Sequence, residues 1–247
     1  MQSNIYVALS AQLSLQRRLD TLANNVANVN TVGFRGEEVS FEELVSQPDS
    51  SPGQSSNNGV SFVSKGENHI STKTGEITQT GNPLDVALRG DVWLAIQTPN
   101  GVAYTRDGRM QMNSEGGLTT LEGYPVLDAG GTAVQLNPDD PPPTINKAGT
   151  IEQAGNNMGA LGLYRMPQGA KLTRAEGVSV VSDVPPVAEL DFLHNGVVQG
   201  YIEKSNVNPM LEMTHLITIQ RNFQAVSTML SDTETSLQDS LKALAGS

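Results

Sequence analysis

The residue types that most often carry chemistry are few and scattered in this chain. Its three histidines, His69, His194 and His215, lack the spacing of a metal-ligand pair. Neither acidic doublet, Glu42–Glu43 or Asp139–Asp140, can aim both carboxylates at one site from a regular element. Neither a Gly-x-Ser-x-Gly nucleophile elbow nor a glycine-rich phosphate loop occurs. The sequence therefore predicts a protein that is not an enzyme and that has no cofactor or metal site.

The composition excludes further classes of protein. The 247 residues carry a formal net charge of −11, which is the wrong sign for contacts with nucleic-acid phosphates. The absence of cysteine rules out disulfides, thiolate metal sites and a cysteine nucleophile. The apolar runs fall far short of the roughly 20 residues that span a bilayer, and the amino terminus lacks the basic region of a secretory signal. We expect no nucleic-acid partner, no small-molecule substrate and no cleavable signal peptide.

Glycine and proline divide the chain into three parts. Residues 1–32 contain neither, residues 201–245 contain only Pro209, and the stretch between them holds 23 of the 24 glycines and 12 of the 13 prolines. Glycine costs a helix interior about 1 kcal/mol and proline about 3 kcal/mol. The distribution predicts an α+β fold with long amino- and carboxy-terminal helices and an inserted all-β domain.

Both terminal segments show the apolar spacing of long amphipathic helices. In the first, apolar residues recur every three or four positions, and Gly33 predicts an end after about Asn30. In the second, Pro209 suits the first turn and the pattern continues to about Leu244. The first stripe comprises Ala8, Ala11, Leu15, Leu19, Leu22, Val26 and Val29. The second comprises Met213, Leu216, Phe223, Val226, Leu230, Leu237, Leu241 and Leu244, with Gln220 and Thr233 on the same side.

Two such helices allow two interpretations. They can pack on each other within one globular domain, or they can take additional partners by oligomerisation. The narrow stripes on helices of this length favour the second, because a two-helix pair has little core of its own.

The middle of the chain has the pattern of short strands separated by turns. Residues 84–96 alternate apolar positions around Arg89–Gly90, which predicts a hairpin with one buried face, and Trp93 lies in this stretch as a core residue. Further strands are predicted at 102–104, 110–112, 118–120, 124–127 and 161–164, with loops at 47–58 and 137–143. The predicted domains are the terminal helices (1–35 and 205–247), an extended linker region (36–80 and 191–204) and a β domain (81–190).

Polar residues gather where the predicted helices meet the middle of the chain. Asparagine is a poor helix residue, so its presence there needs another reason. Either the amides fray the helix end, or they hydrogen-bond a neighbouring helix or strand and fix its register, and the regular Val26 and Val29 favour the second. The residues are Asn24, Asn25, Asn28, Ser205, Asn206 and Asn208, with Gln220 and Arg221 further along the second helix.

Three segments resemble one known family. Residues 22–34 (LANNVANVNTVGF), 101–127 (GVAYTRDGRMQMNSEGGLTTLEGYPVL) and 200–225 (GYIEKSNVNPMLEMTHLITIQRNFQA) are similar to the amino-terminal, central and carboxy-terminal signatures of bacterial flagellar rod and hook proteins. The opening residues 4–8, the run 15–20 and the length resemble proximal rod subunits, with distal rod subunits the alternative.

The resemblance implies a structural role. Family members form axial tubes in which terminal helices of different subunits bundle into a coiled-coil-like core, with β domains further out. The implied partners are copies of the chain, neighbouring proximal and distal rod proteins, surrounding basal-body rings and, in transit, the flagellar type III export apparatus. The implied location is the periplasm-spanning rod of the basal body. An extracellular binding module and a hydrolase are less well supported, because aromatic residues are only 4% of the chain and no nucleophile–base pair is present.

Overall fold

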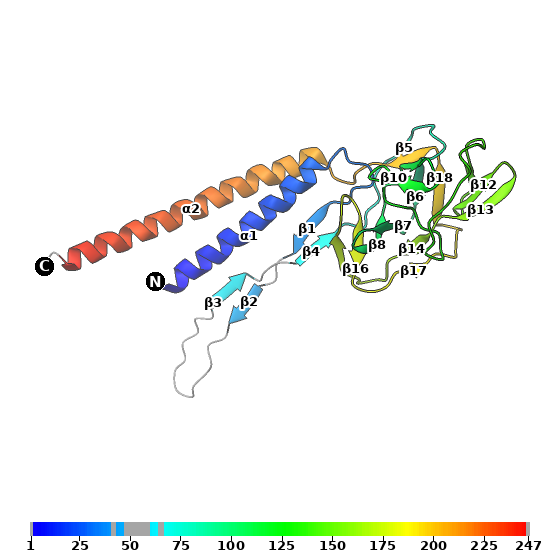
Figure 1. Cartoon of the computed structure of the whole chain (residues 1–247). Coiled ribbons are helices and arrows are strands. Elements are labelled where there is room, and N and C mark those ends of the chain that lie inside the picture. Colours follow the sequence, from blue (N-terminus) through cyan, green and yellow to red (C-terminus); the bar gives the residue numbers. More distant parts are fainter. Residues whose placement is uncertain (1, 41–42, 47–59, 64–66, 246–247) are drawn as a thin grey trace, which may run out of the picture. The chain divides into compact units, whose positions relative to one another are not determined.

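The computed structural model describes residues 2–40, 43–46, 60–63 and 67–245, and it is an α+β structure of two helices and mostly strands (Figure 1). It divides into two compact units. The helical unit comprises Met1–Ala27, Glu37–His69 and Asn208–Ser247, and the β unit comprises Asn28–Gly36 and Ile70–Val207. The predicted loop at 47–58 lies outside the described residues.

Helices α1 (Gln2–Ala27) and α2 (Pro209–Ala245) run antiparallel and pack along each other within the helical unit (Figure 1). Two short strand pairs accompany them: β1 (Glu37–Ser40) lies beside β4 (Glu67–Ile70), and β2 (Glu43–Ser46) pairs with β3 (Val60–Val63). The predicted start of the second helix at Pro209 is confirmed, and its end differs from the prediction by one residue.

The amino-terminal helix ends earlier than predicted. It ends at Ala27, and residues 28–30 form turns in which the backbone N–H of Thr31 donates to the carbonyl of Asn28 at 3.1 Å. The Thr31 hydroxyl also donates to the Asn28 side chain. Because asparagine offers the backbone such local alternatives to helical hydrogen bonds, Val29 lies outside the helical stripe to which the spacing assigned it.

The inner face of α2 is rotated slightly from the predicted stripe. Its partly covered residues follow steps of four and three: Glu212, Leu216, Ile219, Phe223, Val226, Leu230 and Thr233. Met213 and Gln220, which the prediction placed among them, are exposed. Ile219 occupies the turn that Gln220 was expected to fill, because covering Ile219 removes more apolar area from water. The side chain of Leu237 lies outside the described residues.

Asn208 caps α2, since its side-chain oxygen accepts from the backbone N–H groups of Met210 and Leu211 at 3.1 and 3.2 Å. Asn208→Ala removes that acceptor, and we expect it to lower the stability of α2 by about 1 kcal/mol. The measurement is helical circular dichroism during urea unfolding of the purified chain. Asn222→Ala, on an exposed position of the same helix, is the control. Equal losses from both variants would show that the cap contributes nothing of its own.

The β unit contains one six-stranded antiparallel sheet in the order β15-β16-β8-β7-β14-β17. In that order the strands are Leu172–Arg174, Val180–Ser182, Gly101–Thr105, Val92–Thr98, Leu163–Arg165 and Val187–Ala188. The smaller antiparallel groups are β6 (Val86–Arg89) with β18 (Gly196–Gln199), β5 (Ile77–Gln79) with β19 (Tyr201–Glu203), β9 (Met110–Met112) with β10 (Leu118–Thr120), and β11 (Thr144–Ile145) with β12 (Thr150–Gln153) and β13 (Asn156–Ala160).

The hairpin predicted at 84–96 is wrong in two respects. Both strands exist, as β6 and β7, but β6 pairs with β18, and β7 pairs with β8 and β14. Both are also covered on both sides, with Val86, Ala87 and Leu88 all buried. Turn residues such as Arg89–Gly90 show that the chain bends there, but they do not select the partner strand.

Most of the other strands predicted for the middle of the chain are present. Strands lie at 102–104, 110–112 and 118–120, and the last predicted strand is displaced to β14. In the predicted strand 124–127, residues 125–127 form isolated bridges instead of a strand. Trp93 is buried against Ile70 and Val180, so its prediction as a core residue is confirmed. Residues 137–143 are a loop, anchored by the buried Gln153 side chain.

Candidate functional site

The described residues hold no group of three or more His, Asp or Glu side chains arranged to bind a metal ion. No helix in the described part of the chain has the length and hydropathy needed to cross a membrane. The three histidines are exposed and belong to separate places: His69 to β4, His194 to a turn before β18, and His215 to α2. The surfaces that stand out are instead apolar and lie on the helices.

Helix α2 presents apolar side chains that its contact with α1 leaves exposed, in addition to those on the side that meets α1. Met210, Leu211, Met213, Ile217 and Met229 are each between 51 and 75% exposed. On α1, Leu9 and Leu13 are 46 and 55% exposed and lie four residues apart on one face. Exposed apolar residues also occur in the β unit, but those on the paired helices lie along continuous regular elements, which indicates a surface that a further partner covers.

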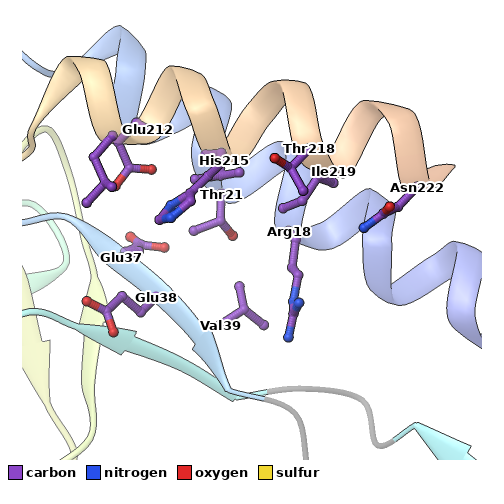
Figure 2. Close-up of a pocket in the computed structure, with 12 residues that line it drawn as sticks. Arg18, Thr21, Glu37, Glu38, Val39, Glu212, His215, Thr218, Ile219 and Asn222 are labelled. Atoms are coloured by element: carbon purple, nitrogen blue, oxygen red, sulfur yellow. The ribbon is translucent and has the colours of Figure 1, made fainter.

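A groove of about 470 Å³ lies within the helical unit, between α1, α2 and β1 (Figure 2). Helix α2 supplies half of its lining, including the exposed Leu211, and Figure 2 shows carboxylates toward one end and Arg18 toward the other. The lining residues are Arg18, Thr21, Leu22, Glu37, Glu38, Val39, Leu211, Glu212, His215, Thr218, Ile219 and Asn222.

The predicted polar residues take different roles. Asn25 is buried, and its amide both donates to the Glu37 carbonyl and accepts from the Glu37 N–H, each at 2.9 Å, so it pairs α1 with β1. Asn206 bonds backbone of the β unit, accepting from the Gly36 N–H and donating to the Lys73 carbonyl, both at 2.8 Å. Asn25 thus binds the backbone of a neighbouring strand, and Asn206 binds two irregular backbone segments.

The remaining predicted residues are placed as follows. Ser205 accepts from the Val207 N–H. Asn24, Gln220 and Arg221 are exposed on their helices, and Asn28 belongs to the turn after α1. Leu15, Leu19, Leu22 and Val26 are at least partly covered on α1, as are Phe223, Val226 and Leu230 on α2.

Sequence reasoning missed a buried ion cluster in the β unit. Glu203 lies between Arg35 and Arg106, with its carboxylate oxygens 2.8 and 2.5 Å from their guanidinium nitrogens, and all three side chains are at most 3% exposed. Burial and the neighbouring Arg106 lower the pKa of Arg35 to about 10, so it stays charged at neutral pH. The only signal in the sequence was the position of Arg35, Arg106 and Glu203 within or next to the three family-like segments.

Three segments of the chain match models of flagellar rod and hook proteins. Residues 5–35 match the model of the flagella basal body rod protein, residues 87–153 the flagellar hook protein FlgE/F/G D1 domain, and residues 198–243 the carboxy-terminal region of flagellar basal body rod FlgEFG proteins. The flagellar basal-body rod protein FlgF of Mesorhizobium japonicum is 46% identical, with 99% of this chain and 98% of that protein covered. The chain belongs to the FlgF family of flagellar basal-body rod proteins.

Two further relatives place it within that family. FlgF of Rhizobium meliloti is 44% identical over the whole of both chains, whereas FlgG of Bacillus subtilis is 29% identical over 97% of this chain and 98% of its own. This FlgF-family chain is a structural subunit of the flagellar basal-body rod, located in the basal body and assembled with other rod components. The resemblance seen in the sequence is thereby confirmed, including the preference for proximal over distal rod subunits.

Proposed function

We propose that the chain builds the rod through its terminal helices, which form a coiled-coil-like axial core with those of neighbouring subunits. Residues 1–35 and 205–247 supply this core, residues 36–80 and 191–204 link it to the β domain, and residues 81–190 form that domain further out. The neighbours are copies of the chain and other proximal and distal rod proteins. The subunit has no catalytic role, reaches the periplasm-spanning rod through the flagellar type III apparatus without a cleavable signal, and contacts the surrounding rings.

The observation that carries this proposal is the apolar outer side of the paired helices. Pairing with α1 leaves Met213 and Ile217 more than half exposed. Met210, Leu211 and Met229 on the same helix are exposed as well. Placing several apolar side chains on one exposed helix is explained by a partner that covers them in the assembled rod.

The groove supports the same proposal. It lies between α1, α2 and β1, and Leu22, Leu211 and Ile219 are among its lining residues. A neighbouring subunit that docks at this groove would fill it with its own side chains. The interface residues we propose are Leu15, Leu19, Leu22, Asn24, Asn25, Val26, Asn28, Val29, Ser205, Asn206, Asn208, Pro209, Met213, Gln220, Arg221, Phe223, Val226, Leu230 and Leu237.

Ile217→Asp tests the outer side of α2. The new carboxylate stays hydrated in the free chain, but assembly would bury it without a partner, which costs several kcal/mol. We expect normal folding, measured by circular dichroism, and at least a tenfold loss of complete rods in basal bodies viewed by electron microscopy. Ser114→Asp introduces the same charge at an exposed polar position of the β unit and serves as the control. Normal rods with Ile217→Asp would contradict the proposed interface.

A further inference from the structure

The chain passes between the two units after Ala27, Gly36, His69 and Val207. Inside the β unit, three segments that adjoin these points, residues 33–36, 70–75 and 203–206, meet around the Glu203 side chain. Its carboxylate accepts from Arg35 at 2.8 Å, from the Gly75 N–H at 2.7 Å and from Arg106 Nε at 2.8 Å. Its backbone carbonyl accepts from the Gly33 N–H at 2.7 Å. One residue thus contacts both other connecting segments.

Asn206 repeats the arrangement three residues later. Its amide oxygen accepts from the Gly36 N–H and its amide nitrogen donates to the Lys73 carbonyl. Its backbone N–H donates to the Phe34 carbonyl at 3.3 Å. Glu203 and Asn206 thus each bond both other connecting segments. Three further bonds support them: Arg35 to the Thr72 carbonyl, Ser71 N–H to the Gly36 carbonyl, and Lys204 N–H to the Glu76 carbonyl beside the second segment.

The two arginines depend on Glu203 to different degrees. Arg106 also donates to the carbonyls of Leu88, Gly90 and Val92, so it keeps three acceptors if the carboxylate is lost. Arg35 also donates to the Thr72 carbonyl, at 3.2 Å, and its Nε atom is buried with no hydrogen-bond partner among the described residues. Loss of the carboxylate would remove the ion pair of the buried Arg35, which belongs to a connecting segment.

We propose that Glu203 is a positioning residue that, together with Asn206, clamps the connecting segments of the β unit independently of its hydrophobic core. The clamp sets where the chain enters and leaves the β unit on its way to both terminal helices. Arg106 anchors the clamp to the strands, since its acceptors lie in and between β6 and β7. This inference concerns the free chain and does not rest on how the helices assemble.

Hydrogen exchange of the purified full chain tests the clamp with Glu203→Gln. The diagnostic amides are Gly33 and Gly36, because their acceptors, the Glu203 carbonyl and the Asn206 side chain, remain in the variant. We expect both to exchange at least ten times faster, whereas the core amides of Ala95 and Gln97 change by a clearly smaller factor. The same factor at all four amides, or no change at Gly33 and Gly36, would overturn the proposal.

Glu189→Gln is the matched control. It removes another buried carboxylate of the β unit, which accepts from the backbone of Leu190 and Asp191 and from Asn195, away from the connecting segments. We expect Gly33 and Gly36 to keep their exchange rates in this variant. If Glu203→Gln does not fold, Asn206→Ala is the second test. In this variant we expect the amides of Gly33 and Gly75, which both bond Glu203, to exchange at least tenfold faster. Unchanged exchange rates at these two amides would refute the clamp.

Discussion

We expect Arg106→Met to lower the free energy of unfolding of the β unit by about 3–5 kcal/mol. This is the largest effect that we expect from any single substitution in that unit. The guanidinium is fully buried and donates to Glu203 and to three backbone carbonyls. Methionine fills much of the volume but donates nothing, so those carbonyls lose their donor and Glu203 loses half of its compensation. Breaking a buried ion pair by removing one partner costs far more than the pair itself contributes.

Urea unfolding followed by tryptophan fluorescence measures this loss. Trp93 is the only tryptophan in the chain and is buried in the β unit, so its emission reports that unit. Arg109→Met is the control: Arg109 forms a partly exposed ion pair with Asp107, and such pairs contribute at most about 1 kcal/mol. If the two variants unfold at the same urea concentration, the buried cluster does not hold the β unit together.

Leu22→Asp is expected to abolish the rod while leaving the β unit folded. Leu22 is the most deeply buried apolar side chain of α1 among the described residues, and it belongs to the helical unit. An aspartate there places an unpaired charge in an apolar contact, at a cost of several kcal/mol. A pair of helices with little core of its own cannot absorb that cost.

Two measurements separate the helical unit from the β unit in this variant. Swimming in soft agar should be lost, because the rod is part of the flagellum, whereas the urea midpoint of Trp93 fluorescence should stay within error of the parent chain. Gln16→Asp puts the same charge on an exposed position of α1 and should retain motility. Motile cells carrying Leu22→Asp would show that this face of α1 is not needed for assembly.

The amino-acid sequence by itself determined where the helices could form. Helix propensity is local, so the absence of glycine and proline from residues 1–32 and their scarcity after residue 200 predicted α1 and α2 without any knowledge of packing. The start at Pro209 follows equally from local chemistry. The family was recognisable for the same reason, since its signatures are contiguous runs of residues.

Tertiary structure alone decided which surfaces meet. The spacing on α2 predicted Gln220 on the inner side, but contact with α1 selected Ile219. Alternating residues predicted β6 and β7 as strands, but period-two alternation does not reveal the partner, and β6 pairs with a strand more than 100 residues later. Arg35, Arg106 and Glu203 look like surface charges in the sequence, because burial of a charge depends on partners that only the folded chain brings within hydrogen-bond distance.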